Sequence, residues 1–343
     1  ISLGLVGSEM CIRDRYKRGN ACCLLAVQAG LQVSQGRKIM TKNAFIAITG
    51  RANAGKSSLT NLLVGEKISI VSEKPQTTRN RINGVLTKGD TQYVFMDTPG
   101  MHKPKTKLSE HMVKSIRQSV DDVDCAILMA DVTKKISSIE QDLIRSFASH
   151  GTAVVLLLNK VDLLKDKSEI LKIIQQYSEL YDFEEIIPIS VKNRINTDQI
   201  MPVLERFAVE GEHFFPDDIA TDRTERFMCS EIVREKILRV MQEEIPHGVA
   251  VDVEKFKSRM KGDAEIIDIS VVIICEKESH KGMIIGKGGE RLKQIGTMAR
   301  GDMEDLLQAK VNLQCFVKVK EDWRNREAIL RSLGYDKTDF DWH

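Results

Sequence analysis

Residues 50–57 read Gly50-Arg51-Ala52-Asn53-Ala54-Gly55-Lys56-Ser57. A short apolar run, 45–49, precedes this stretch, and a run with helical spacing, 58–63, follows it. A strand, a glycine-rich loop and a helix in this order form a phosphate cradle, because the loop turns successive N–H groups inward and the helix N-terminus adds positive charge. We expect Lys56 to reach the β- and γ-phosphates of a nucleotide and the Ser57 hydroxyl to hold Mg²⁺.

A second motif follows the apolar strand 93–96 and reads Asp97-Thr98-Pro99-Gly100. A carboxylate at the end of a strand can bind Mg²⁺ through water, and the N–H group of a glycine can meet a γ-phosphate. We therefore assign Asp97 to the metal, through a water molecule, and Gly100 to the terminal phosphate.

Two later motifs select the base. Asn159-Lys160-Val161-Asp162 follows the strand 153–158, and Ser190-Val191-Lys192 follows 186–189. The Asp162 carboxylate can accept hydrogen bonds from N1–H and N2–H₂ of guanine, which adenine lacks. Backbone N–H groups of 190–192 are placed to meet the guanine O6. Four motifs in this order, each after a strand, predict GTP.

With these motifs the chain resembles the translation-factor-like GTPases. Pro75-Gln76-Thr77-Thr78-Arg79 lies where such proteins have their first switch loop, and the basic stretch Lys103–Lys107 is typical of a second switch. The resemblance implies that one threonine completes the Mg²⁺ shell. We favour Thr78, and Thr77 is the alternative.

Position 101, after the Asp97–Gly100 motif, is Met101, where Ras-like enzymes carry a glutamine that orients water. A thioether cannot do this, so hydrolysis is slow or relies on another group. By resemblance, Asn53 helps to hold a K⁺ ion that acts as an arginine finger does; the alternative is that Asn53 only shapes the loop.

The predicted catalytic residues are Asn53, Lys56, Thr78 and Gly100. The predicted nucleotide contacts are Gly50, Arg51, Ala52, Asn53, Ala54, Gly55, Lys56, Ser57, Ser58, Asp97, Thr98, Pro99, Gly100, Met101, Asn159, Lys160, Val161, Asp162, Ser190, Val191 and Lys192; the predicted metal ligands are Ser57, Thr78 and Asp97.

The chain has 343 residues, enough for two domains. Its net charge of only +2 argues neither for nor against nucleic acid. The seven cysteines form no Cys-x-x-Cys pair, which is typical of a reducing compartment, and no apolar run is long enough to cross a bilayer. We expect a cytoplasmic protein, with peripheral attachment to the inner face of the cell membrane as an open alternative.

Strands alternating with helices from Met40 onward predict an α/β domain with a mostly parallel sheet and helices on both faces. The strand 82–87 is expected to be its antiparallel edge. We expect a GTPase domain at 40–208, with its last helix at 197–206, and a polar linker at 209–225. Residues 1–39 are expected to be a non-native or unstructured leader, with Met40 as the start.

The second domain, 226–335, is expected to run helix, strand, strand, helix, break, helix, strand, followed by a tail at 336–343. Its strands are expected at 249–253, 265–275 and 312–319. The break, Gly286-Lys287-Gly288-Gly289, is a Gly-x-x-Gly loop, the signature of an α+β type II K-homology (KH) domain. From 279 to 300 there are five basic residues and one acidic residue, a local charge of +4 that favours RNA. The predicted RNA-binding residues are Lys281, Ile284, Ile285, Gly286, Lys287, Gly288, Gly289, Arg291 and Lys293.

A GTPase followed by one KH domain resembles the Era family of bacterial ribosome-assembly GTPases over residues 40–335. The resemblance also rests on 231–237, 284–287, 317–320 and 330–335; Ala52, Ala54, Val191 and Gly288 depart from the family pattern. It implies a monomer that binds small-subunit rRNA near its 3′ end and assists assembly of the small ribosomal subunit. Two other readings remain: an RNA-binding module whose GTPase is a sensor with negligible turnover, and a nucleotide-driven membrane or cell-cycle protein.

Overall fold

The computed structural model describes residues 40–100, 106–112, 123–166, 168–241, 245–262 and 264–335. The predicted leader 1–39, the predicted tail 336–343, Met101 and most of the predicted second switch therefore lie outside the described residues. Within the described ranges, no helix is long and apolar enough to cross a membrane.

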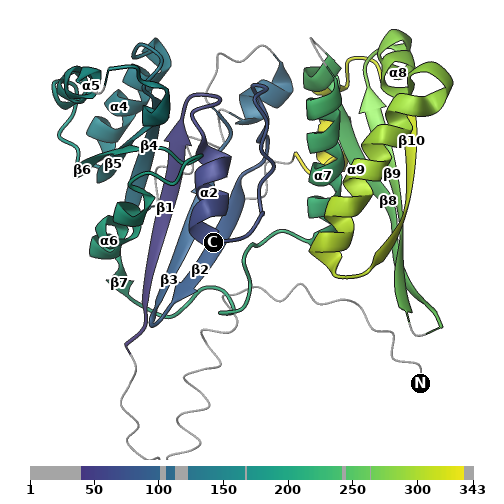
Figure 1. Ribbon diagram of the computed structural model, residues 1–343, viewed down its shortest axis with the longest axis horizontal. Helices are drawn as coiled ribbons and strands as arrows, with labels where there is room; N and C mark the ends of the chain where they lie inside the picture. Colours follow the sequence, from purple (N-terminus) through teal and green to yellow (C-terminus); the bar gives the residue numbers. More distant parts are fainter. Residues whose placement is uncertain are drawn as a thin grey trace, which may run out of the picture. The chain divides into compact units, whose positions relative to one another are not determined.

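The GTPase domain is built on one mainly parallel sheet in the order β2-β3-β1-β4-β5-β6 (Figure 1). Only β2, against β3, and the two-residue β7, against β1, are antiparallel. This confirms the predicted fold class and the antiparallel strand near 82–87. The strands are β1 (Lys42–Gly50), β2 (Ile82–Lys88), β3 (Thr91–Asp97), β4 (Cys125–Asp131), β5 (Val154–Asn159), β6 (Glu185–Ile189) and β7 (Val209–Glu210).

Helices cover both faces of this sheet, which is why β3, β4 and β5 are buried along their whole length. One apolar cluster joins the sheet to α2 (Lys56–Val64) and α6 (Ile200–Leu204). Another joins it to α4 (Ser138–His150) and α5 (Glu169–Ser178). The carboxyl ends of β1, β3, β5 and β6 carry the nucleotide motifs, so the fold brings these motifs to one edge of the sheet.

The predicted helix 197–206 is divided. Residues Thr197–Gln199 and Glu205–Phe207 form short 3₁₀ turns, η2 and η3, on either side of the five-residue α6. Pro202 lies within α6 and has no N–H to donate to the preceding turn, which limits a regular α-helical hydrogen-bond pattern here.

The predicted linker 209–225 lies along the GTPase sheet rather than running free. Gly211 donates its N–H to the carbonyl of Thr41, and the Gln92 side chain accepts from the N–H groups of Phe214 and Phe215. Further along, Asn83 Nδ2 donates to Asp222 Oδ2 at 2.9 Å. The polar composition predicted a connector and gave no sign of these contacts.

The KH domain has a three-stranded sheet in the order β10-β9-β8, with α7 and α9 lying across one face (Figure 1). Its elements are α7 (Glu225–Val240), the 3₁₀ turn η4 (Ile245–Gly248), β8 (Ala250–Lys261), β9 (Ala264–Cys275), α8 (Glu278–Ile285), η5 (Lys287–Gly289), α9 (Glu290–Leu307), β10 (Lys310–Val319), η6 (Trp323–Asn325) and α10 (Glu327–Ser332). The order is the predicted one. Strand β8 is longer than the predicted strand 249–253, because the charged run after it also pairs with β9, beyond a bulge between Val253 and Lys255.

Candidate functional site

The P-loop, residues 50–57, is held tightly against the sheet. Gly50 and Gly55 have φ angles of 135° and 104°, which side chains rarely adopt. A Cβ atom on Gly50 would lie 2.3 Å from the Met129 carbonyl oxygen, and one on Gly55 would lie 2.5 Å from Asn159 Nδ2. Gly100, from the second motif, has the same constraint, because its Cβ would meet Ala52 Cα at 2.6 Å. Backbone shape and space both require glycine at 50 and 55, and space alone requires it at 100.

Lys56 and Asp97 are the buried charges of the site. Lys56 Nζ donates to the carbonyl oxygens of Gly50 and Arg51 at 3.2 and 3.0 Å, and burial lowers the Lys56 pKa to about 8, although Asp97 opposes the shift. Asp97 is 0% exposed, and neither carboxylate oxygen has a hydrogen-bond partner in the described part of the chain. Burial raises the pKa of Asp97, and Lys56 offsets part of that rise. A buried carboxylate without partners is costly unless a cation joins it.

The first switch loop lies over this site. Thr78 Oγ1 is 2.7 Å from Ser57 Oγ, so the two predicted metal-binding hydroxyls are neighbours. The Thr77 hydroxyl instead donates to the carbonyl of Lys74 at 2.6 Å, within its own loop. This geometry favours Thr78 over Thr77 as the metal ligand. Residues of the P-loop and of 70–78 line a pocket of about 50 Å³, and Ser58 is also part of its lining.

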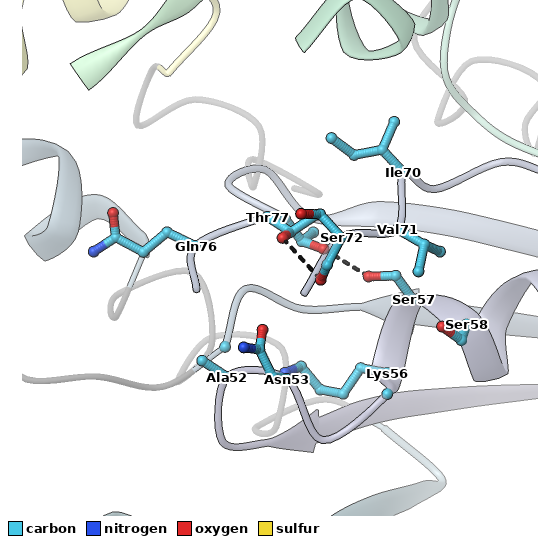
Figure 2. A pocket seen from close by; sticks show the side chains of 13 residues that line it. Ala52, Asn53, Lys56, Ser57, Ser58, Ile70, Val71, Ser72, Gln76 and Thr77 are labelled. Atoms are coloured by element: carbon cyan, nitrogen blue, oxygen red, sulfur yellow. Dashed lines mark hydrogen bonds between the residues drawn. The ribbon is translucent and has the colours of Figure 1, made fainter. Parts of the chain in front are cut away.

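Asn53 connects the P-loop to the same switch. Its φ of 63° places it in the left-handed region, and its side-chain amide donates to the Glu73 carbonyl at 2.6 Å. Asn53 and Lys56 are both among the residues that line the pocket (Figure 2). An amide group and a backbone carbonyl thus meet at the edge of the phosphate site.

The guanine motif also ties three loops together. Asn159 Nδ2 donates to the Ala54 carbonyl at 2.8 Å, while Asn159 Oδ1 accepts from the Val191 N–H at 3.1 Å. Lys160 Nζ lies 2.6 Å from Asp131 Oδ2. Burial would raise the pKa of Asp131, but the hydrogen bonds from Lys160 and Thr133 outweigh it and hold that pKa below its usual value. Asn159 and Lys160 therefore hold the loops of the site together through their side-chain hydrogen bonds.

Asp162 is placed differently. It is only partly buried, and within the described residues no hydrogen bond or ion pair engages its carboxylate, which is therefore available to a base.

In the next motif, 190–192, the Ser190 N–H donates to the Ile195 carbonyl and the Val191 N–H donates to the Asn159 side chain. The Lys192 N–H is therefore the donor left for a guanine oxygen. Val161 begins the short turn that carries Asp162, and Thr98 is fully buried, with its hydroxyl bonded to the Ile48 carbonyl.

The Gly-x-x-Gly loop joins α8 to α9. Gly286, Gly288 and Gly289 have φ angles of 74°, 60° and 82°. Lys287, Arg291 and Lys293 are exposed beside the loop. Lys281 is half-buried and lies 3.7 Å from Glu278, and Arg291 donates to the Met283 carbonyl. Ile284 is fully buried in the KH core, so its contribution is to packing rather than to direct contact with RNA, whereas Ile285 is partly exposed.

A groove of about 480 Å³ runs from this loop between α9 and β10. It is lined by Gly289, Leu292, Lys293, Gly296, Thr297, Arg300, Val311, Asn312, Leu313 and Cys315. Sequence reasoning predicted Gly289 and Lys293 and missed the others. The β10 residues had a findable signal, since Val311, Leu313 and Cys315 alternate along one face of a predicted strand.

Helix α7 of the KH domain reaches the first switch. Arg234, 1% exposed and held by Glu231, donates to the Thr77 carbonyl. The Glu235 carboxylate accepts from the Val71 N–H at 3.1 Å and pairs with Lys67 at 2.9 Å. These three KH residues were not predicted as part of the nucleotide site, because nothing local in a helix sequence indicates which distant loop it contacts.

The segment after β10 also contacts switch residues. Arg79 donates to the Val249 carbonyl at 2.6 Å, and its guanidinium lies 5.8 Å from the centre of the Trp323 ring. Leu108 and Met112, which follow the predicted second switch, pack in one apolar cluster with Trp323. The KH domain thus contacts residues on both sides of the nucleotide site.

Comparison with known proteins gives two family models. Residues 45–160 match the model described as "50S ribosome-binding GTPase", and residues 244–324 match the KH domain model. Among curated relatives, "GTPase Era" of Clostridioides difficile (strain 630) is 48% identical over 87% of this chain and 99% of its own length.

The chain belongs to the Era family of GTPases. The Era protein of Alkaliphilus metalliredigens (strain QYMF) is also similar, at 47% identity over 86% of this chain and 99% of its own.

Two solved Era structures share the fold. One is described as Era in complex with MgGDPNP and nucleotides 1506–1542 of 16S ribosomal RNA; the other is a substituted Aquifex aeolicus Era bound to GDP and AlF₄⁻. Each is 36% identical to this chain, covers 86% of it and 99% of its own chain, and superposes with a TM-score of 0.81.

Proposed function

We propose that this Era-family GTPase is a GTP-hydrolysing switch that binds small-subunit rRNA near its 3′ end and assists small ribosomal subunit assembly. The observation that carries the proposal is the presence, in one chain, of a close-packed P-loop and an open Gly-x-x-Gly groove. The RNA is inferred from the solved Era complex with nucleotides 1506–1542 of 16S rRNA.

The metal site fits Mg²⁺. The buried Asp97 carboxylate has no partner in the described part of the chain, and the Ser57 and Thr78 hydroxyls lie 2.7 Å apart beside the phosphate cradle. Oxygen donors of this kind suit Mg²⁺. When bound, the ion neutralises charge on the phosphate oxygens. We assign Ser57 and Thr78 to the ion directly and Asp97 through water.

The remaining residues bind and orient the nucleotide. Lys56 is held over the cradle by two P-loop carbonyls, ready to exchange them for phosphate oxygens. The Gly100 N–H is assigned to the γ-phosphate. Asp162 is assigned to the two guanine donors and the Lys192 N–H to O6, with Asn159 holding these loops at the correct spacing.

We also propose that K⁺ supports hydrolysis. Asn53 stands beside the Glu73 carbonyl at the pocket edge, and neutral oxygens of this kind suit a monovalent cation. GTP turnover should be higher in KCl than in NaCl at equal ionic strength, and Asn53→Ala should remove the difference. Equal turnover of the unmodified chain in both salts would contradict the role of K⁺ and favour an activating partner.

For location we propose the cytoplasm, where GTP and ribosomal subunits occur, and for oligomeric state a monomer. Peripheral membrane attachment remains the alternative, and co-sedimentation with lipid vesicles would reveal it.

The central experiment measures RNA affinity and GTP turnover in the same preparation. An RNA with the sequence of nucleotides 1506–1542 of 16S rRNA should bind the full chain more tightly than a shuffled RNA of equal length. Measurements with GTP and then with GDP should give different affinities. Equal affinity for the two RNAs would contradict the assignment of the rRNA 3′ region as the target. Undetectable GTP turnover would contradict the hydrolysing switch and favour an RNA-binding module whose GTPase domain only senses the nucleotide.

The Asp162→Asn variant tests whether Asp162 selects guanine. The new amide can donate to the C2 carbonyl of xanthine, but it offers guanine one neutral acceptor oxygen in place of two charged ones, and its NH₂ group opposes a guanine donor. GTP affinity should therefore fall while xanthosine triphosphate binds. Charged hydrogen bonds contribute about 1.5–3 kcal/mol each, which predicts a loss of at least tenfold. RNA affinity without nucleotide should stay unchanged.

A further inference from the structure

The KH sheet has two faces with different surroundings. Side chains of β9 and β10 at odd positions pack against α7 and α9 in the domain core. Side chains at even positions point to the opposite side, which we call the outer face. The bulge in β8 between Val253 and Lys255 shifts the alternation there, so that after it the odd positions of β8 lie on the outer face.

One half of the outer face is covered and the other half is exposed. Ala250, Val272 and Ile274 pack in one cluster with Trp323 and Leu330. Beyond them, thirteen outer-face positions continue to the hairpin end of β8 and β9 and across β10. They are Lys255, Lys257, Arg259, Lys261, Ala264, Ile266, Asp268, Ser270, Lys310, Asn312, Gln314, Phe316 and Lys318.

The exposed half is strongly basic. Six of these side chains are basic and one, Asp268, is acidic; Asp252, opposite Val272 at the border of the covered half, is a second acidic residue of the outer face. The whole chain, in contrast, has nearly equal numbers, 51 basic and 49 acidic residues. An ordinary solvated surface of this protein would mix the two signs. Some of the charge is offset at the margins, where Lys318 pairs with Glu254 at 2.8 Å and Lys310 lies 3.7 Å from Glu304.

The Asp268 carboxylate holds neighbouring side chains of this face in place. Asp268 accepts from Arg259 Nε at 2.9 Å and from Asn312 at 2.9 Å, and Lys255 lies 3.9 Å away. Lys257 and Lys261 are exposed, and no ion pair involves either of them within the described residues. Phe316, 51% exposed, lies on the same face. Cations around an exposed aromatic ring suit nucleic acid, since the cations meet phosphates and the ring stacks on a base.

The outer face is continuous with the groove through β10. This strand is at the edge of the sheet: its Leu313 and Cys315 line the groove, while Gln314 and Phe316 lie on the outer face. Asn312 borders both, because it lines the groove and its side chain donates to Asp268 on the outer face. An RNA that leaves the groove across this edge therefore meets the basic face without crossing another element of the domain.

We propose that the outer face is a second RNA-binding surface, which holds the phosphate backbone of RNA flanking the segment in the groove. The inference rests on the proposed RNA-binding function and extends the RNA footprint of the KH domain from one face to two. An anionic membrane is the competing occupant for a basic face. RNA is favoured because the face adjoins the groove and presents an aromatic ring among hydrogen-bonding side chains.

The test compares two RNAs on the full chain. The long RNA has the sequence of nucleotides 1506–1542 of 16S rRNA, and the short RNA is a single strand that fills only the groove. The outer-face variant is Lys255→Gln with Lys257→Gln and Lys261→Gln. The control variant is Lys42→Gln with Lys88→Gln and Lys172→Gln, three exposed lysines of the GTPase domain with the same loss of charge.

The outer-face variant should bind the long RNA about tenfold more weakly, and the slope of log affinity against log salt should fall by about 2, since each lost phosphate contact removes roughly 0.7–0.9. Its affinity for the short RNA should match that of the unmodified chain. Phe316→Ala should also weaken only the long RNA, by about tenfold.

Unchanged affinity and salt slope for the long RNA would overturn this inference and leave the groove function intact. If the unmodified chain bound neither RNA, the proposed function itself would fail. Vesicles containing anionic lipid provide the third measurement. Vesicle binding that the outer-face variant loses, together with unchanged binding of the long RNA, would assign the face to a membrane and overturn the inference.

Discussion

The P-loop and the Gly-x-x-Gly loop are both glycine-rich, and both precede a helix, yet their glycines serve different purposes. In the P-loop, added Cβ atoms on Gly50 and Gly55 would meet neighbouring protein atoms at 2.3 and 2.5 Å. In the KH loop, a Cβ on Gly286 would meet the Arg291 Cβ at 2.7 Å, but Cβ atoms on Gly288 and Gly289 would meet nothing within 4 Å. The first loop is a closed cradle whose shape is fixed by packing against the protein itself. The second is an open platform, whose space is left for a polymer that passes over it.

The largest expected effect comes from breaking the closed cradle. Gly55→Ala places a Cβ 2.5 Å from Asn159 Nδ2 at a φ of 104°. Either the P-loop or the Asn159 bridge must move, so GTP affinity should fall at least about 100-fold in a calorimetric titration. RNA affinity without nucleotide should remain.

Gly65→Ala is the matched control for that change. Gly65 ends the same helix with a φ of 87°, and an added Cβ would meet nothing within 4 Å. It should lower stability by about 1–2 kcal/mol and leave GTP affinity unchanged. If both variants bound GTP equally well, the close packing of the P-loop would not matter for binding.

The next largest effect concerns the open platform. Gly288→Asp with Gly289→Asp introduces two negative charges and two side chains where RNA phosphates are proposed to pass, at positions with open space around an added Cβ. RNA affinity should fall at least tenfold at moderate salt, with GTP affinity unchanged. Gly89→Asp with Gly151→Asp, two left-handed glycines of the GTPase domain with open space, adds the same charge and should leave RNA affinity as it was. RNA binding that survives the KH variant would rule out the loop as a phosphate platform.

A smaller effect should come from the contact that joins the two regions. Arg234→Lys keeps a charge near Glu231 but loses the geometry that also reaches the Thr77 carbonyl. Thr78 should then be held less firmly, so GTP turnover should fall several-fold while GDP affinity stays the same. Arg239→Lys, at an exposed residue paired with Glu235, should change neither quantity. Equal turnover in all three proteins would show that the P-loop site works without support from α7.

The smallest expected effect is that of Gly288→Ala. The φ of 60° costs an alanine about 1–2 kcal/mol, and the added Cβ has free space. Thermal unfolding should shift slightly, and RNA affinity should change by less than about threefold. A tenfold loss of RNA affinity would mean that the RNA backbone touches Gly288 itself, which would sharpen the description of the platform.

The sequence predicted the nucleotide motifs well because each motif is local. Residues 50–57 carry their own backbone requirements, and the strands before 97, 159 and 190 are strongly apolar. The domain order and the KH break were predictable for the same reason. The boundaries at 208 and 225 and the individual site roles stay predictions.

What sequence reasoning missed depends on distant partners. The contact of Arg234 with Thr77 and the attachment of Phe214 to Gln92 join residues more than 100 positions apart. The length of β8 was missed because Lys255–Lys261 is too charged to resemble a buried strand. Ile284 was assigned to RNA because it adjoins the glycine loop, whereas the helix turns it into the core.

The position of Trp323 has an optical consequence. The ring is fully buried, its Nε1 donates to the Gly248 carbonyl at 2.9 Å, and the guanidinium of Arg79 lies over it. Since Arg79 follows Thr78, any displacement of the first switch that withdraws Arg79 changes the charge above the indole. The chain has only two tryptophans, so a Trp342→Phe protein would have Trp323 as its sole indole fluorophore. Its emission would then report the nucleotide state of the GTPase domain from within the KH domain, without an added label.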